Sequence, residues 1–367
     1  MLVVVRESSY EYAQLRERLF AVMDLIGGRR MGRGERVLVK PNLLSPARPE
    51  EAVLTHPLVV RAAVEYVLEV GGRPVVMDSP ALGSFGRILR EGGFADALRG
   101  LGVEAAPFAE SATVDVGPPF GRIEVARAAL ECPWVLNLPK LKTHAQMLLT
   151  LGVKNLFGCV VGHRKPDWHL RLGVDGEMFA RLLVTIHEVV KPAFTVLDGV
   201  LALEGQGPGK GGTPRPVGVL MASRDAYALD AAVCRLLSLP PEDLPTLRWA
   251  RRLGHWRTEP EIDGDLPRVD NFALPRTEGL LVGPPAVQGL LRRHLTPRPV
   301  ITAKRCENCR LCVEICPAGA LSPGPDSPRI DYEACIRCYC CLEICPRGAV
   351  AKVEGPAARL FRLVTGK

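Results

Sequence analysis

The sequence predicts an α/β protein, in which a large domain with a mostly parallel sheet flanked by helices precedes a small cysteine-rich C-terminal module. Two observations support this prediction. Over roughly the first 240 residues, short β-branched runs alternate with longer amphipathic runs, as in buried parallel sheets covered by helices. Near residue 300 the alternation stops, and eight of the 12 cysteines occupy one repeated spacing pattern.

Each expected element has its own local signal. The expected strands are short β-branched runs bounded by turn residues, at 2–7, 35–44, 73–80, 132–141, 193–201 and 216–223. The expected helices are longer runs with apolar residues at helical spacing, at 10–25, 56–72, 85–102, 145–158 and 226–237. Because strand and helix follow one another repeatedly, we expect parallel strands joined by crossover helices.

The composition is that of a soluble globular protein, with 47% hydrophobic and 24% charged residues. The formal net charge is +7, and the basic residues are scattered rather than clustered, so we expect no nucleic-acid partner. No apolar run approaches the roughly 18 residues of a membrane span. The opening MLVVVRESSYEY lacks the basic flank and cleavage site of a signal peptide. We therefore expect a cytoplasmic protein without a membrane span, whose oligomeric state the sequence does not indicate.

The C-terminal block is a duplicated cysteine pattern that reads C-x2-C-x2-C-x3-C-P in each repeat. This run is typical of bacterial two-cluster ferredoxins, in which the fourth cysteine of each repeat ligates the other cluster. We therefore expect two 4Fe-4S clusters. One ligand set is Cys306, Cys309, Cys312 and Cys345, and the other is Cys335, Cys338, Cys341 and Cys316.

Paired C-x2-C units can also form tetrahedral zinc sites, which is the alternative interpretation of the block. Two full repeats that both end in Cys-Pro favour the clusters and indicate a reducing compartment. Cys340 occupies no ligand position; we expect a small buried thiol there, with an alternative cluster ligand as the other possibility. The connector HLTPRPVITAK precedes the block. The predicted boundaries are an α/β domain at 1–296, a two-cluster 4Fe-4S ferredoxin-type α+β domain at 297–355 and a C-terminal tail at 356–367.

Polar residues gather where the expected strands end. Lys40 and Asn42 follow one strand, and Lys140, Lys142 and His144 follow another. Because open α/β sheets bind ligands beyond the carboxyl ends of their strands, we expect one cleft at this edge. The candidates for binding an organic group are Lys40, Asn42, Lys140, Lys154, Asn155 and Asp198, and the candidates for catalysis are Lys142, His144 and His163.

Several strings in the large domain resemble a known family. VLVKPNLL, THP, MDSP, NLPKLKTH, GVKNLFG, VLDG and EGQGP are similar to the domain of unknown function 362 family, the uncharacterised iron–sulfur-centre proteins. The resemblance covers nearly all of the chain before the cysteine block, and many members carry the same block. It implies a fold and a set of site residues, but no reaction.

The glycines of EGQGPGKGG indicate a close approach of the backbone to another group. There is no Walker loop, and no G-x-G-x-x-G opens a helix. Binding of a nucleotide through either of these motifs is therefore not expected.

Several ammonium groups that face one cavity repel each other unless an anion lies between them. We therefore expect Lys40, Lys140, Lys142 and Lys154 to converge with His144 on a small anionic substrate, or on a phosphorylated organic cofactor such as a flavin. The alternative is that these lysines form an ordinary solvated face.

The expected function is that of an oxidoreductase that relays low-potential electrons through two 4Fe-4S clusters to this anion. His144 or His163 would handle the proton, and a ferredoxin would be the redox partner. One alternative is an electron-carrier or cluster-handling binding protein. The other is a non-redox metal-dependent isomerase or hydrolase with structural clusters, whose metal site would use His56, His144, His163 or His169 with Asp198 or Glu204.

Overall fold

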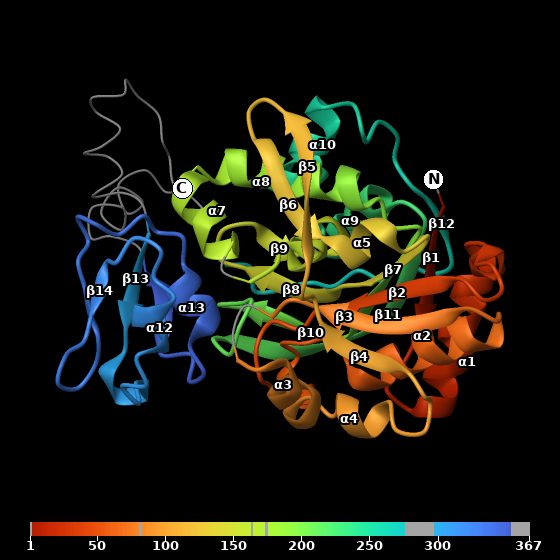
Figure 1. The fold of residues 1–367 in the computed structure, drawn as a ribbon, viewed down its shortest axis with the longest axis horizontal. Coiled ribbons are helices and arrows are strands. Elements are labelled where there is room, and N and C mark those ends of the chain that lie inside the picture. The colour runs from red at the N-terminus through yellow and green to blue at the C-terminus, as the bar shows by residue number, and fades with distance from the viewer. Residues whose placement is uncertain (1, 81–82, 163, 173–174, 276–296, 354–367) are drawn as a thin grey trace.

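The computed structural model describes residues 2–80, 83–162, 164–172, 175–275 and 297–353. In these ranges the chain forms a large α/β domain and a small α+β module beside it (Figure 1). No described helix is long and apolar enough to cross a bilayer.

The large domain contains a ten-stranded mixed sheet that is mostly parallel. The path through the sheet is β12 (Glu261–Asp263), β1 (Leu2–Glu7), β11 (Gly212–Ser223), β10 (Phe194–Gly205), β7 (Trp134–Leu138), β2 (Arg36–Pro41), β3 (Arg73–Asp78) and β4 (Glu104–Pro107). Off this path, β8 (Lys140–His144) pairs with β10 in parallel and with β9 (Leu148–Thr150) antiparallel. Only the pairs that β11 makes with β1 and β10, and the β8–β9 pair, are antiparallel among these strands.

The strand order creates a crevice between β2 and β7. From β2 the chain moves outward to β3 and β4, and it then returns to the other side of β2 as β7. The paired residues Lys40 and Asn137 lie at the carboxyl ends of these two strands. This reversal of strand order is the position where open α/β sheets bind ligands.

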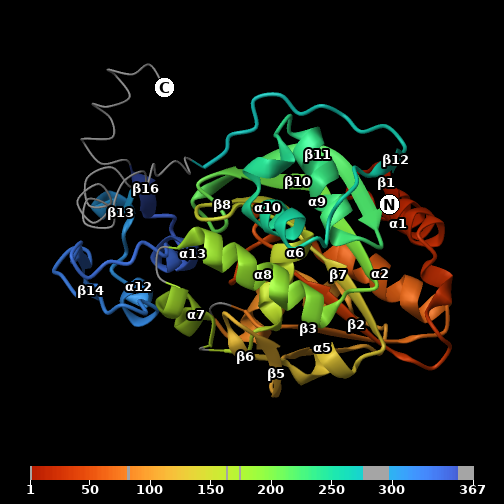
Figure 2. The same ribbon diagram turned by 90° about the horizontal axis from the view of Figure 1, so that it is seen from above.

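Helices cover both faces of the sheet (Figures 1 and 2). On one face lie α1 (Tyr12–Leu25), α2 (Pro57–Glu69), α3 (Phe85–Glu91) and α4 (Phe94–Ala97). On the other face lie α5 (Arg127–Glu131), α6 (Gly152–Asn155), α8 (Gly176–Val190), α9 (Ala226–Leu236) and α10 (Pro245–Arg252), with α7 (Arg164–Leu172) toward the module. Short 3-10 turns are η1 (Gly28–Arg30), η2 (Pro49–Glu51), η3 (Leu156–Cys159), η4 (Pro241–Asp243) and η5 (Ala303–Arg305). The result is a three-layer α/β domain with an apolar core on each side of the sheet.

Three sequence expectations need correction. The helix expected at 145–158 is wrong, because this segment forms β9, the single turn α6 and η3. The segment is buried almost throughout, and periodicity cannot distinguish a buried strand from a buried helix in such an apolar run. The helix expected at 85–102 breaks into α3 and α4 at Gly92 and Gly93, where Gly93 has a φ of 74°. The strands expected at 193–201 and 216–223 are longer, and they form one antiparallel hairpin.

The antiparallel hairpin of β5 (Ser111–Gly117) and β6 (Gly121–Ala126) was not predicted. Its strands are about half exposed and alternate weakly in burial, so they carry little of the pattern by which a buried strand is recognised.

The C-terminal module has its own small core. Strand β13 (Arg298–Ile301) pairs with β16 (Val350–Val353), and β14 (Leu321–Ser322) pairs with β15 (Arg329–Ile330). Two short helices, α12 (Leu311–Glu314) and α13 (Cys340–Ile344), complete the module. The division at residue 296/297 remains a prediction, and the predicted tail at 356–367 lies outside the described residues.

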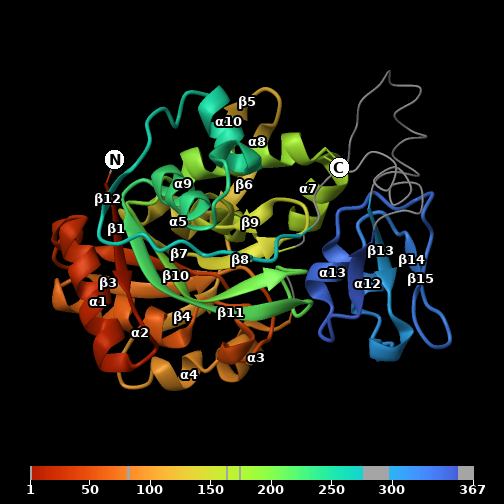
Figure 3. The same cartoon turned by 180° about the vertical axis from the view of Figure 1, so that it is seen from behind.

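The connection between β10 and β11 holds the module against the large domain (Figure 3). The backbone N–H of Lys352 donates to Gln206 Oε1 at 3.4 Å, and its Nζ donates to the carbonyl oxygen of Ala145 at 2.7 Å. A Cβ at Gly209 would lie 2.6 Å from the carbonyl oxygen of Glu343. The glycine-rich segment therefore permits a close approach of backbone to α13.

Candidate functional site

Two small cavities in the module are each lined by four predicted cysteine ligands. One is lined by Cys306, Cys309, Cys312 and Cys345. The other is lined by Cys316, Cys335, Cys338 and Cys341. These are the two crossed sets that the duplicated pattern predicts. Four thiols around a void suit a cubane cluster, in which each iron takes one thiolate.

The cysteine loops repeat the same strained backbone. In each repeat the residues before and after the second cysteine have φ values between 49° and 62°, at Asn308, Arg310, Arg337 and Tyr339. Such values are uncommon for residues other than glycine and occur where a ligand site requires them. Backbone N–H groups also point at sulfur: Ala349 N lies 3.1 Å from Cys345 Sγ, and Ala320 N lies 3.3 Å from Cys316 Sγ. The residues therefore fit two 4Fe-4S clusters, which supply single electrons at low potential when bound.

A larger cavity of about 400 Å³ lies between the large domain and the module. From the large domain it is lined by the ends of β2 and β3, by β8 and by α7. From the module it is lined by Ile315, Cys340 and Ile344, each of which is next in sequence to a predicted cluster ligand. Cys340 also lines the cavity of the second cysteine set. A molecule bound here would therefore touch residues adjoining both cluster sites.

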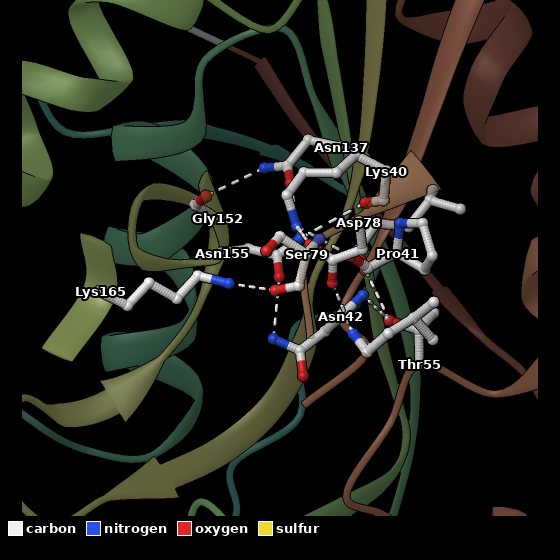
Figure 4. Close-up of polar contacts among 12 residues, drawn as sticks. Lys40, Pro41, Asn42, Thr55, Asp78, Ser79, Asn137, Gly152, Asn155 and Lys165 are labelled. Atoms are coloured by element: carbon white, nitrogen blue, oxygen red, sulfur yellow. Dashed lines mark hydrogen bonds and ion pairs between the residues drawn. The ribbon is translucent and has the colours of Figure 1, made fainter. Parts of the chain in front are cut away.

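A chain of side-chain amides runs from the sheet to this cavity (Figure 4). Asn137 Nδ2 donates to the carbonyl oxygen of Gly152 at 2.9 Å, and Asn155 Nδ2 donates to Asn137 Oδ1 at 2.8 Å. Asn42 Nδ2 then donates to Asn155 Oδ1 at 2.8 Å, which leaves Asn42 Oδ1 to accept from Lys142 Nζ at 2.7 Å. Each amide in such a chain polarises the next, so the orientation of the last oxygen toward Lys142 is fixed.

Lys142 is a buried ammonium held only by neutral acceptors. Its side chain is 1% exposed, and its second acceptor is the carbonyl oxygen of Val53 at 2.8 Å. Among the described residues no carboxylate lies within ion-pair distance of its Nζ. Burial, together with the charge of Lys154, lowers the pKa of Lys142 to about 7. An anion bound in the cavity would therefore supply the ion-pair partner that Lys142 lacks among the described residues.

Two further lysines line the same cavity. Lys165 Nζ donates to the carbonyl oxygen of Ser79, and burial lowers its pKa to about 8 against the opposing charge of Asp78. Lys154, on α6, lies with its Nζ 5.9 Å from the ring centroid of Phe157, and burial lowers its pKa as well. All three ammonium groups thus face one cavity in a desolvated environment.

The expected convergence of four lysines is wrong for Lys40 and Lys140, which do not line the cavity. Lys40 Nζ lies 2.9 Å from Asp78 Oδ1, and Lys140 Nζ lies 2.7 Å from Asp198 Oδ2, with both pairs buried. Both lysines therefore already have a counter-ion, and Asp198 pairs with Lys140 and does not line the cavity. Sequence position could not show this, because both carboxylates come from other strands. The alternative of a solvated lysine face is wrong too, since Lys40, Lys140 and Lys142 are buried.

A second buried group extends the Lys140 pair away from the cavity. Tyr10 Oη donates to Asp198 Oδ1 at 2.7 Å, and the Tyr10 ring stacks on His56 at 3.6 Å between centroids. Burial and Asp198 raise the pKa of Tyr10 well above its usual range. Both carboxylate oxygens of Asp198 accept hydrogen bonds from neighbouring residues. We therefore assign Tyr10, Lys140 and Asp198 a structural role at the carboxyl ends of the strands.

His144 lines the cavity as a neutral imidazole. Its Nδ1 accepts from the backbone N–H groups of Gln146 and Met147, both at 3.1 Å. The ring proton is therefore on Nε2, which lies 2.9 Å from Glu343 Oε1. Burial lowers the pKa of His144 to about 4. A ring with Nδ1 committed to two donors is poorly placed to take a proton near neutral pH. His163, the other predicted proton carrier, lies outside the described residues.

Several buried polar atoms around the cavity have no hydrogen-bond partner among the described residues. They are His144 Nε2, Thr150 Oγ1, His169 Nδ1 and Glu343 Oε1. His144 Nε2 and Glu343 Oε1 lie 2.9 Å apart and so contact each other, which leaves Thr150 Oγ1 and His169 Nδ1 without a polar partner among the described residues. An unsatisfied buried polar atom costs about 1–3 kcal/mol, and native structures contain few of them. Two such atoms on one cavity wall favour a polar ligand at this site.

Sequence reasoning placed Lys165 among the polar residues that follow the strand ends but did not select it as a site residue, and it did not single out Glu343 or Asp230. Glu343 and Glu314 both line the cavity, and both lie between the third and fourth cysteines of their repeats. A glutamate at the same position of both repeats was the sequence signal that could have identified these two cavity residues. Asp230 accepts from the backbone N–H groups of Gly152 and Val153 at 2.7 and 3.2 Å, and thereby anchors α6. An acid inside an apolar helix was its only signal.

The residues proposed for a metal-dependent alternative lie apart. His169 lines the cavity, His56 stacks on Tyr10, and Glu204 lies 3.5 Å from Arg215. Outside the two cysteine sets, the ranges that the structure describes contain no three His, Cys, Asp or Glu side chains placed together as ligands for a single metal ion.

Comparisons with known proteins agree with this two-part organisation. The model of the domain of unknown function family DUF362 matches residues 37–235, and that of the 4Fe-4S dicluster domain matches residues 305–349. The thylakoid-associated protein sll1697 of Synechocystis sp. is 40% identical over 281 residues, which cover 74% of this chain and 87% of the relative.

Two solved structures show a distant likeness. One is a Thermotoga maritima protein, at 14% identity and a TM-score of 0.37, covering 54% of this chain and 53% of the other. The second is the lactate racemase apoprotein of Thermoanaerobacterium thermosaccharolyticum, at 10% identity and a TM-score of 0.41, covering 62% and 55%. This chain thus spans about half the length of each, and at these scores the likeness carries no functional argument.

Proposed function

Because this chain belongs to the DUF362 family and carries a 4Fe-4S dicluster domain, we propose that it is an oxidoreductase acting on a small anion. The observation that carries the proposal is the shared cavity of about 400 Å³. Its walls combine three lysines of the large domain, two buried (Lys142 and Lys165) and one half-buried (Lys154), with residues adjoining the cluster cysteines of the module. A site of this kind brings a bound anion beside a source of electrons.

The anion would lie between Lys142, Lys154 and Lys165. Three ammonium groups that face one desolvated cavity repel each other, and a carboxylate or phosphate group between them removes that repulsion. Charge-assisted hydrogen bonds from lysine are about twice as strong as neutral ones. Thr150 Oγ1 and His169 Nδ1 would hold other polar groups of the same molecule. The phosphorylated cofactor expected from the sequence remains a second possible occupant.

In the proposed reaction the anion gains two electrons and two protons. The electrons come from an external one-electron carrier of low potential, which is oxidised by one electron in each of two encounters. The protons come from lysines lining the cavity, because Lys142 and Lys165 have pKa values of about 7 and about 8 and exchange protons near neutral pH. His144 would instead orient the anion through its Nε2–H.

The proposal is tested by identifying what the cavity binds. The protein is purified without oxygen, small molecules are released by denaturation, and mass spectrometry identifies any anion present in stoichiometric amount. Binding of that compound is then measured for wild type, Lys142→Met and Lys154→Met, with iron content determined for each. The matched control is Lys191→Met, which removes an exposed lysine at the end of α8.

We expect Kd to rise by roughly 30-fold or more in each cavity variant, the equivalent of about 2 kcal/mol. Iron content should stay unchanged, and the control should bind normally. If no anion co-purifies, or if the cavity variants bind it as wild type does, the cavity is not the substrate site. The binding-protein alternative predicts that the compound binds but never oxidises the reduced clusters.

A further inference from the structure

The two cysteine sets differ in how they face the solvent and the large cavity. In the first set Cys309 is exposed, and Cys306 and Cys345 are partly exposed. Cys312 of the first set is buried, and in the second set Cys338 and Cys341 are buried while Cys316 and Cys335 are partly exposed. The sets therefore differ in that a fully exposed cysteine, Cys309, belongs to the first set alone. The second set also shares a wall residue, Cys340, with the large cavity, whereas the first set shares none. The first set therefore adjoins the outer surface, and the second adjoins the cavity.

The surface around the first set is basic. Lys304, Arg305, Arg310 and Arg347 are all exposed near its cysteines, and Arg310 and Arg347 line the cysteine cavity itself. Arg347 is paired with Glu307. No carboxylate of the described residues lies within ion-pair distance of Lys304, Arg305 or Arg310. We call the surface formed by these four basic residues and Cys309 the basic rim.

We propose that the basic rim is the docking surface for an acidic one-electron carrier protein, and that electrons enter the molecule there. Complementary charge speeds the encounter of two proteins and fixes their orientation, because opposite potentials steer diffusion. The exposed Cys309, which lines the first cysteine cavity together with Arg310 and Arg347, brings the incoming electron close to the first cluster site. The second cluster site shares the wall residue Cys340 with the large cavity. In this proposal an electron passes from the first cluster to the second and from there to the cavity.

The electron count is simple at this surface. In one encounter the reduced carrier loses one electron and the oxidised chain gains one, and no bond or proton is exchanged. Two encounters deliver the two electrons that the proposed reaction requires. This inference rests on the proposed function for its direction, but the docking step itself needs no substrate.

The basic rim has another possible role, which is to balance the negative charge of the nearby cluster. That role would change the reduction of the cluster by any reductant, large or small. A docking role would change only the reaction with a charged protein, and it would weaken with salt, because exposed charges are screened over about 10 Å at 0.1 M ionic strength.

The test compares stopped-flow reduction of anaerobic, cluster-loaded protein by two donors: a reduced acidic ferredoxin and a small photoreduced deazaflavin. The variant is Lys304→Glu/Arg305→Glu, which lies in η5 outside the cysteine turns. The control is Arg30→Glu/Arg33→Glu, two exposed arginines that follow α1 in the sequence, and Figure 1 shows α1 on the side of the large domain away from the module. Iron content and visible absorbance establish that all three proteins hold their clusters.

At low salt we expect the second-order rate constant with ferredoxin to fall at least tenfold in the rim variant and less than twofold in the control. The difference should shrink as salt is added, while the deazaflavin rates stay within twofold of one another. A basic carrier, cytochrome c, should react faster with the reduced rim variant than with wild type. Equal ferredoxin rates for rim variant and wild type overturn the docking proposal. A parallel loss with deazaflavin overturns it too, in favour of charge balance.

These results are separable from the proposed function. If ferredoxin reduces wild type through the rim but no cavity anion exists, docking stands and the substrate proposal fails. If the anion binds but reversing the charge of the basic rim does not change the rate of reduction by ferredoxin, the docking proposal fails and the substrate proposal stands.

Discussion

Replacing Lys142 by methionine tests the electrostatics of the cavity without any ligand. The substitution keeps an unbranched apolar stem and removes one buried ammonium. That ammonium has only neutral partners, Asn42 Oδ1 and the carbonyl oxygen of Val53. The loss of these two hydrogen bonds should cost about 1–3 kcal/mol at every pH, because two buried acceptors lose their donor. The change in charge should have a different effect, which depends on pH.

The magnitude of the pH-dependent effect follows from the pKa of Lys142. The pKa is 10.5 ordinarily and about 7 in the folded protein. Between these values the unfolded chain binds more protons than the folded one, so this lysine makes stability rise with pH. One pKa unit corresponds to about 1.4 kcal/mol. Integrated from about pH 6 to about pH 9, Lys142 therefore makes the free energy of unfolding rise by about 2–3 kcal/mol.

The assay is urea unfolding of anaerobic protein at several pH values across this range, for wild type and Lys142→Met. The variant should lack the rise, so its stability relative to wild type should improve by about 2–3 kcal/mol as the pH falls from 9 to 6. The matched control is Lys40→Met, which removes the partner of the buried Asp78 and should destabilise by about 3–5 kcal/mol. Parallel curves for wild type and Lys142→Met would refute the reasoning, since Lys142 would then have its ordinary pKa.

Three further predictions concern the rest of the molecule. Anaerobic protein should contain about eight iron and eight sulfide per chain and should bleach with dithionite, whereas about two zinc and no sulfide would show zinc sites instead. A chain ending before Val300 should remain folded by circular dichroism, because the module has a largely separate core; an insoluble or molten product would place the module in the main core. Asp198→Asn should destabilise by about 3–5 kcal/mol, because Lys140 loses its buried counter-ion, yet it should leave the affinity of the co-purifying anion unchanged, and a large affinity loss would place Lys140 in the site after all.

The fold was predictable from sequence to the extent that local pattern determined it. The runs at 36–41 and 57–69 have clear periodicity and clear turn residues, and they form β2 and α2 as expected. The run at 145–158 did not, because its apolar residues are buried on all sides and strand and helix then look alike. The antiparallel direction of β10 and β11 depended on tertiary pairing and not on the runs themselves.

The candidate site was predictable where ligands are sequence neighbours. The grouping of the eight cysteines followed from spacing, and the structure places them in those sets. The lysines were harder, because a lysine's role depends on which carboxylate reaches it from a distant strand. Asp78 and Asp198 neutralise Lys40 and Lys140, whereas no carboxylate in the described part of the chain lies within ion-pair distance of Lys142. That difference arises from three-dimensional contacts and has no signature in the sequence.

The most direct test of the central claim is a single-turnover reoxidation. Protein freed of small molecules is reduced without oxygen, the excess reductant is removed, and the anion identified by mass spectrometry is added while visible absorbance is followed. The proposed function predicts that the absorbance of the oxidised clusters returns, with two electrons consumed per molecule of anion reduced, and that Lys142→Met is slower at the same concentration. Clusters that stay reduced in the presence of the bound anion would contradict the claim that this cavity is an active site.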